Sequence, residues 1–323
     1  MVMRRVFNRH VCFCVLSTAI LAGLALMTSQ TKVYAAQNCQ GLAGGGSRGD
    51  DGSGLIVCDG KGKGSGWSGK DGWGELSGGR DIDMSGKSGQ AAVTVYNGTG
   101  RGTTTNIRIS SKLTVKDSGG SNNNPAIKVH NKGVLVVDDA DVTGVQKGID
   151  VSGSGSSVTV VQGSIGVRAG GGGSLIEVKG GGTVELMRGV TIKTVSGNVN
   201  GEVVINNGGT LQLDGQSFTG VTTGIVIKGG GNASVKGGAT ITVKQDGTGF
   251  KMQGAGTADV MDMMIKGSGG KGTGAEVSSG TLKMTRVGIT TGSAGTGAKV
   301  TSGTLRLEGS STITVGAGGT GLW

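Results

Sequence analysis

The fold is decided by two consecutive stretches, GTGAEVSSGTLKMTRVGITT at residues 272–291 and GTGAKVTSGTLRLEGSSTITV at residues 295–315. Looser copies of the same pattern begin at Thr222 and Gly247, and traces of it surround Gly148 and Gly201. One glycine precedes the first apolar residue of each unit, in steps of 25, 25, 23 and 24 residues, at Gly224, Gly249, Gly274, Gly297 and Gly321. Self-similarity at a fixed period of this size indicates a solenoid.

Each unit holds three short segments in which apolar and polar residues alternate, such as AEV, TLKM and GITT. Alternation is the strand period, and the Gly, Ser, Asn and Thr between the segments are turn residues. A unit of about 24 residues with three short strands predicts one coil of a right-handed, single-stranded parallel β-helix, which buries its apolar residues by stacking. We expect this solenoid over residues 91–323. Leucine-rich repeats would need a leucine consensus and a helical segment, and a β-sandwich would not keep a fixed period.

The composition agrees with a narrow core. The chain has 71 Gly but only 3 Trp, 2 Tyr and 4 Phe, so aliphatic side chains must fill the interior. The formal net charge is +10. Lys and Arg are scattered and no aromatic side chains accompany them, so we do not expect nucleic acid as a partner.

The N-terminus has the layout of a secretory signal. Arg4, Arg5 and Arg9 precede an apolar run over residues 11–27, and small residues flank a cleavage position between Ala35 and Ala36. An uncleaved anchor is the alternative. After residue 35 no apolar run approaches the roughly 20 residues that span a bilayer, so we expect export and no membrane span once residues 1–35 are removed.

Residues 36–90 differ from the repeats and are predicted to form a Gly-rich N-terminal cap, with Trp67 and Trp73 covering the first coil; partial disorder over 41–66 is the alternative. The cysteines that follow the signal are Cys39 and Cys58. In an oxidising compartment we expect a disulfide between them rather than two free thiols.

The segment between these cysteines contains Arg48-Gly49-Asp50, a candidate receptor-binding triplet for integrin contact. Export, a closing disulfide and flanking glycines favour that interpretation. In a chain so rich in glycine, chance is the competing explanation.

Signs of catalysis are few. His130 is the one histidine after the signal, no nucleophile-elbow motif accompanies it, and no residues have zinc spacing, so no cofactor is expected. Alternation places Asp139 and Asp141 on one side of a strand and Asp138 on the other. Such a pair is a weak candidate for holding calcium or for acid–base work. The segments that pectin-cleaving β-helices use are missing, so we interpret the aspartates as solvated and the protein as non-enzymatic. A secreted β-helix enzyme acting on carbohydrate is the alternative.

The long signal MVMRRVFNRHVCFCVLSTAILAGLALMTSQTKVYAAQNCQG, together with the coil pattern GTG-A-x-V-x-SGTL, resembles the inducible autotransporters of Bartonella. The resemblance implies a Gly-rich right-handed β-helical passenger that a C-terminal β-barrel carries across the outer membrane. It also implies adhesion to host cells, or an effect on vascular endothelium, through a cell-surface receptor or extracellular matrix.

This chain departs from the family pattern in having no ten-residue amphipathic strands for a translocator barrel. We therefore expect a passenger fragment or a truncated product. Its expected location is the cell surface, the outer membrane or the medium, with periplasmic retention as the alternative.

Overall fold

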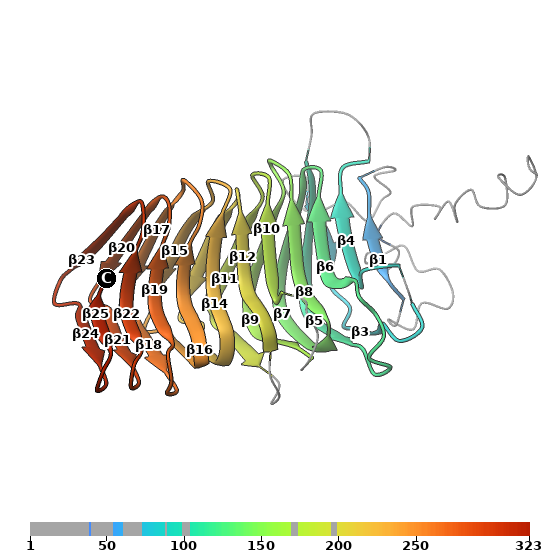
Figure 1. The fold of residues 1–323 in the computed structure, drawn as a ribbon. Helices are drawn as coiled ribbons and strands as arrows, with labels where there is room; N and C mark the ends of the chain where they lie inside the picture. Colours follow the sequence, from blue (N-terminus) through green and yellow to red (C-terminus); the bar gives the residue numbers. More distant parts are fainter. Residues whose placement is uncertain are drawn as a thin grey trace, which may run out of the picture. The chain divides into compact units, whose positions relative to one another are not determined.

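The computed structural model describes Cys39 and residues 54–60, 73–87, 89–98, 104–168, 174–194 and 199–323, all within one compact unit, residues 38–323. The elements in these ranges are β-strands, and every pair of neighbouring strands is parallel. They form two sheets whose coils stack one behind the next (Figure 1). The predicted parallel β-solenoid is confirmed.

The first sheet has the order β1-β4-β6-β8-β10-β12-β14-β16-β18-β21-β24, and β19, β22 and β25 continue from β16. Its strands are β1 (Ile56–Cys58), β4 (Val93–Tyr96), β6 (Pro125–His130), β8 (Lys147–Ser152), β10 (Ile176–Lys179), β12 (Val199–Asn207), β14 (Phe218–Lys228), β16 (Thr240–Met252), β18 (Met264–Gly267), β19 (Thr273–Val277), β21 (Gly288–Thr291), β22 (Thr296–Val300), β24 (Thr312–Val315) and β25 (Thr320–Leu322).

The second sheet has the order β2-β5-β7-β9-β11-β13-β15-β17-β20-β23, with β3 paired to β5. Its strands are β2 (Trp73–Leu76), β3 (Arg80–Asp83), β5 (Thr105–Lys116), β7 (Gly133–Val145), β9 (Ser157–Val167), β11 (Thr183–Thr194), β13 (Thr210–Asp214), β15 (Asn232–Lys236), β17 (Thr257–Met261), β20 (Thr281–Thr285) and β23 (Thr304–Glu308).

The register between coils keeps the same kind of residue at the same position. On the first sheet one inward column consists of Ile56, Val93, Ile127, Ile149, Ile176, Val204, Ile225, Phe250, Ala275 and Ala298. Every one of these side chains is buried. Burying an aliphatic side chain contributes about 1.5–3 kcal/mol, so the stacked columns supply the stability that a single coil lacks.

The recurring glycine of the repeat lies where two inner faces meet. A Cβ at Gly224, Gly249, Gly274 or Gly297 would collide with Cγ2 of an isoleucine, which is Ile241, Ile265, Ile289 or Ile313 in turn. It would also approach the carbonyl oxygen of the equivalent glycine one coil further on. Glycine is therefore required by close approach of the backbone to the isoleucine column.

The expectation of three short strands in every coil is correct only for part of the chain. The C-terminal coils have it, for example in β19, β20 and β21. Earlier coils instead contain strands of 11 to 13 residues, β5, β7, β9 and β11, which continue around a corner. A register shift at the corner bends such a strand without ending it.

The segment expected to act as a cap contributes strands of its own. Within residues 36–90, β1 pairs with β4, and both β2 and β3 pair with β5. Trp73 belongs to β2, is partly buried and lies opposite Asn106, whereas Trp67 lies outside the described residues. The described part of this segment is therefore a first coil of the solenoid, because its alternating residues 73–83 continue the ladder.

Candidate binding face

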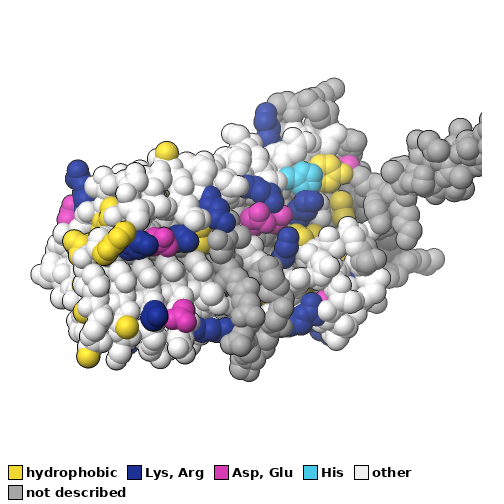
Figure 2. Space-filling view, viewed as in Figure 1, with side chains coloured by type: hydrophobic (Ala, Val, Ile, Leu, Met, Phe, Trp, Pro, Cys, Tyr) yellow, Lys and Arg dark blue, Asp and Glu magenta, His cyan; other side chains and the backbone are white. Residues whose placement is uncertain are grey.

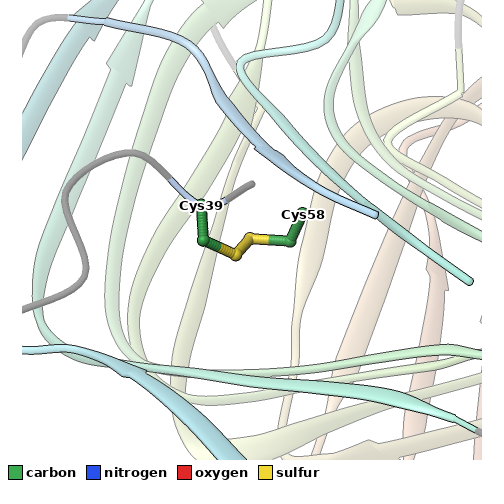
Figure 3. Close-up of a disulfide and its surroundings, with 2 residues drawn as sticks. All are labelled: Cys39 and Cys58. Carbon is green, nitrogen blue, oxygen red and sulfur yellow. A yellow bond between two sulfur atoms is a disulfide. The ribbon is translucent and has the colours of Figure 1, made fainter. Parts of the chain in front are cut away.

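The predicted disulfide is present between Cys39 and Cys58, with their Cα atoms 4.6 Å apart (Figure 3). Both cysteines are buried, and the Cys39 amide donates a hydrogen bond to the Val57 carbonyl at 2.8 Å. The bond ties the incoming chain to β1 and belongs to the hydrophobic core. Arg48-Gly49-Asp50 and the cleavage position Ala35/Ala36 lie outside the described residues.

Asp139 and Asp141 lie on the outer side of β7, as predicted, opposite Gln162 and Ser164 of β9. Asp141 accepts a hydrogen bond from Ser164 at 2.9 Å and lies 3.5 Å from the Lys112 ammonium. Within the described residues, no three His, Cys, Asp or Glu side chains come together in a way that could hold a metal ion.

Asp138 corrects the expectation drawn from alternation. Its carboxylate also faces outward, where it pairs with the Arg108 guanidinium at 2.8 Å. Val137 and Ala140 are both buried, so two consecutive residues between them face solvent as the strand turns the corner. The Asp138 and Asp141 carboxylates are held by different basic partners.

Charged side chains lie in register on the outer side of the first sheet. One outward column runs through Thr94, Lys128, Asp150 and Glu177 in register. Beyond β14 the same column continues through Lys251, Glu276 and Lys299. Figure 2 shows basic and acidic side chains following one another along this side. We call the part that runs from β4 to β10 the binding face.

Ion pairs link side chains along this outer surface of the first sheet. The Lys179 ammonium lies 3.1 Å from Asp150 and 3.5 Å from Glu177. Burial disfavours the charged form of Lys179, but the two carboxylates outweigh it and raise its pKa. Further along the column, Lys251 pairs with Glu276 at 3.2 Å, and the Lys299 ammonium lies 4.8 Å from the ring centroid of Trp323. The face thus offers fixed charges of both signs.

A neighbouring outward column begins with an aromatic stack. Tyr96 ends β4 and His130 ends β6, and their rings are parallel within 6° with centroids 5.0 Å apart. Figure 2 shows the described histidine, in cyan, beside hydrophobic atoms and close to charged groups. The column continues with Ser152 and Lys179, so a small hydroxyl follows the ring of His130.

The electrostatic surroundings keep His130 neutral. Burial and the nearby charge of Lys128 lower its pKa, and Asp150 opposes them only in part. Burial also raises the pKa of Tyr96, with a smaller contribution from Asp59. At neutral pH both rings are therefore uncharged and present polar edges beside Lys128 and Asp150.

The Tyr96–His130 stack was not predicted from the sequence, although the sequence contains a signal for it. VTVYN at residues 93–97 and IKVHN at 127–131 have the same pattern, and their register places Tyr96 opposite His130. The asparagines that follow are joined too, because Asn131 Nδ2 donates to the Asn97 carbonyl at 2.5 Å. His130 is partly buried at the end of β6.

Comparison of the chain with protein-family models, curated proteins and solved structures found no match. Among the residues that the structure describes, there is no helix with the length and apolar character of a membrane span.

Proposed function

We propose that this protein is an exported, non-enzymatic, passenger-like binding protein that acts at the bacterial surface or on host cells. It would attach through the binding face to a host cell-surface receptor or to extracellular matrix. The secretory layout of residues 1–35 and the resemblance of the N-terminus and repeats to autotransporter passengers support the export and the setting. The binding face supports the mode of action.

One observation carries the proposal: the Tyr96–His130 stack lies on the same sheet surface as the linked charges of Lys128, Asp150, Glu177 and Lys179. Interfaces between proteins commonly place aromatic anchors among polar groups. Charges held at fixed positions on a regular sheet favour a partner with complementary charges and hasten encounter with it. A rigid solenoid presents such a surface with little loss of conformational entropy on binding.

The test uses residues 36–323, purified with the disulfide intact, on endothelial cells and on matrix-coated surfaces. We expect saturable binding that weakens as salt rises, because exposed charges are screened. A double variant, Lys128→Ala with His130→Ala, should bind at least about tenfold more weakly, as loss of an anchoring pair does.

A matched control is available on the outer face of the second sheet, where Lys283 and Arg306 are in register. The double variant Lys283→Ala with Arg306→Ala removes two basic side chains away from the binding face and should bind normally. Absence of binding by the parent protein would refute the proposed function. Equal loss in both double variants would refute the assignment to the binding face.

A further inference from the structure

A cavity opens on the second sheet, away from the binding face. Its volume is about 380 Å³, and it spans strands β9, β11, β13 and β15 at the corner where β11 bends. Pockets of this size accommodate small organic ligands. Its lining includes Glu185, Met187, Arg188, Gln212 and Asp214.

The rim of the cavity is held in place from inside. The register shifts between Leu186 and Gly189, which turns Met187 and Arg188 outward. Beneath them, Gln216 is 1% exposed, and its amide nitrogen lies 2.8 Å from the Met187 carbonyl oxygen and 2.9 Å from that of Asp214. The same nitrogen lies 3.3 Å from the Val190 carbonyl oxygen. The buried Gln216 amide therefore links β11 and β13, the neighbouring strands that supply most of the lining, so the cavity is organised before any ligand arrives.

The charges that line the cavity are balanced. Arg188 lies 3.4 Å from Asp214, and Lys236 is opposite Asp214 in the register of the next coil. Glu185 accepts a hydrogen bond from Thr159 at 3.4 Å. Two acidic and two basic side chains line the cavity, so it does not select a ligand by net charge. Glu185 and Asp214 would repel an anionic ligand, and Arg188 and Lys236 would repel a cationic one.

The remaining lining combines donors, acceptors and apolar surface. The Gln212 amide provides both a donor and an acceptor, whereas the carboxylate of Glu185 accepts and the guanidinium of Arg188 donates. Met187 is 40% exposed and Val161 lies in the same lining, so a hydrophobic shelf accompanies the polar groups. A ligand that matches this arrangement is uncharged, rich in hydroxyl groups and partly apolar on one side.

We propose that this cavity binds a neutral saccharide. The C–H side of a pyranose ring would lie on Met187 and Val161, while its hydroxyl groups would bond to Glu185, Gln212 and the Arg188–Asp214 pair. The site is a binding site on the opposite sheet from Lys128 and His130, and it does not depend on attachment to host cells.

The experiment applies residues 36–323 to an array that carries neutral and acidic glycans, followed by titration calorimetry with the neutral glycan that gives the strongest signal. The double variant Met187→Ala with Gln212→Ala is expected to lose at least tenfold in affinity. Both side chains are exposed at the surface, so the fold should tolerate their removal.

The chain offers a control of the same composition. Met261 is 37% exposed on the second sheet beyond the cavity, and Gln253 is exposed directly after β16. The double variant Met261→Ala with Gln253→Ala should keep the parent affinity. The proposal is overturned if no neutral glycan binds, if only acidic glycans bind, or if Met187→Ala with Gln212→Ala binds as tightly as the parent.

Discussion

The coils that carry β5, β7 and β9 and the coils that carry β19 to β24 build the same kind of core by different means at their corners. In the early coils a long strand bends around a corner, and polar side chains bond across neighbouring coils. In the late coils each corner is a tight turn, and the recurring glycine lets an isoleucine column pack against bare backbone. The stacked interior therefore constrains the strands far more strongly than it constrains the corners.

One group of polar hydrogen bonds in the early coils lies at the corner where the second sheet leads into the first. Asp83 accepts hydrogen bonds from the Ser85 amide at 2.9 Å and from its hydroxyl at 2.6 Å. Asp117 accepts a hydrogen bond from the backbone amide of Asn122 at 3.0 Å. The side-chain amide of Asn122 donates to the Met84 carbonyl at 3.1 Å. The bond from Asn122 to Met84 joins the loop that follows β5 to the turn that follows β3. In the late coils, the repeated packing of an isoleucine column against the recurring glycines holds neighbouring coils together.

Removal of the disulfide should give the largest loss of stability that is confined to the early coils. Replacing Cys39 and Cys58 by serine should cost about 3 kcal/mol, because the cross-link no longer restricts the unfolded chain. Since each coil contacts only its neighbours, the loss should appear as faster amide exchange in β4 and not in β20. Equal acceleration in both strands would contradict a local effect.

Substitution of the recurring glycine should destabilise the late coils in the same way. Gly274→Ala should cost about 2 kcal/mol, because its Cβ would collide with Ile289 and approach the Gly297 carbonyl oxygen. Gly321 holds the equivalent position in the last repeat, and a Cβ there would meet nothing within 4 Å, so Gly321→Ala is the control. Urea unfolding should separate the two variants, and equal midpoints would show that close packing is not the reason for the glycine.

The Asp83 carboxylate should make the stability of the early coils depend on pH. Hydrogen bonds from Ser85 and Ser118 hold its pKa well below the usual range. A carboxyl group whose pKa is depressed in the folded state stabilises that state above its unfolded pKa of about 3.9, and the contribution is lost as pH falls toward the folded pKa. The free energy of unfolding should therefore decline below about pH 4, and Asp83→Asn should flatten that decline.

Thermal melts recorded from pH 2 to 7 measure this acid response, which should be weaker in Asp83→Asn than in the parent protein. An unchanged acid response in Asp83→Asn would count against the role assigned to the Ser85 and Ser118 bonds.

The smallest effect concerns the binding face. His130 should titrate below about 6.5, because burial and Lys128 both disfavour its protonated form. NMR titration of its ring protons should show a higher pKa in Lys128→Ala, whereas Lys132→Ala, at an exposed lysine nearby, should change it less. The lowered pKa also means that the stacked arrangement loses stability as pH falls through the unfolded value. A midpoint at or above 6.5 in the parent protein would contradict the burial described here.

Much of the fold follows from the sequence because a solenoid repeats its constraints. The spacing of Gly224, Gly249 and Gly274 reports the coil length, and alternation reports which residues face inward. Corners are less predictable, since Asp138 and Asp139 both face out where a strand bends without a turn signal. The Tyr96–His130 stack depends on a 34-residue step between coils, which no fixed period reveals. The cavity beside Met187 arises from another register shift, at Gly189.

The unequal spacing of the coils has a consequence for how such a chain changes over time. The step from Val93 to Ile127 is longer than that from Ala275 to Ala298, yet both pairs are neighbours in the same inward column. Extra residues are therefore absorbed at corners, where they touch solvent and leave the ladder intact. Insertions of new sequence, or duplication of an entire coil such as 272–294, can be accepted without redesign of the interior. The solenoid thus separates the residues that must stay constant from a periphery that is free to diversify.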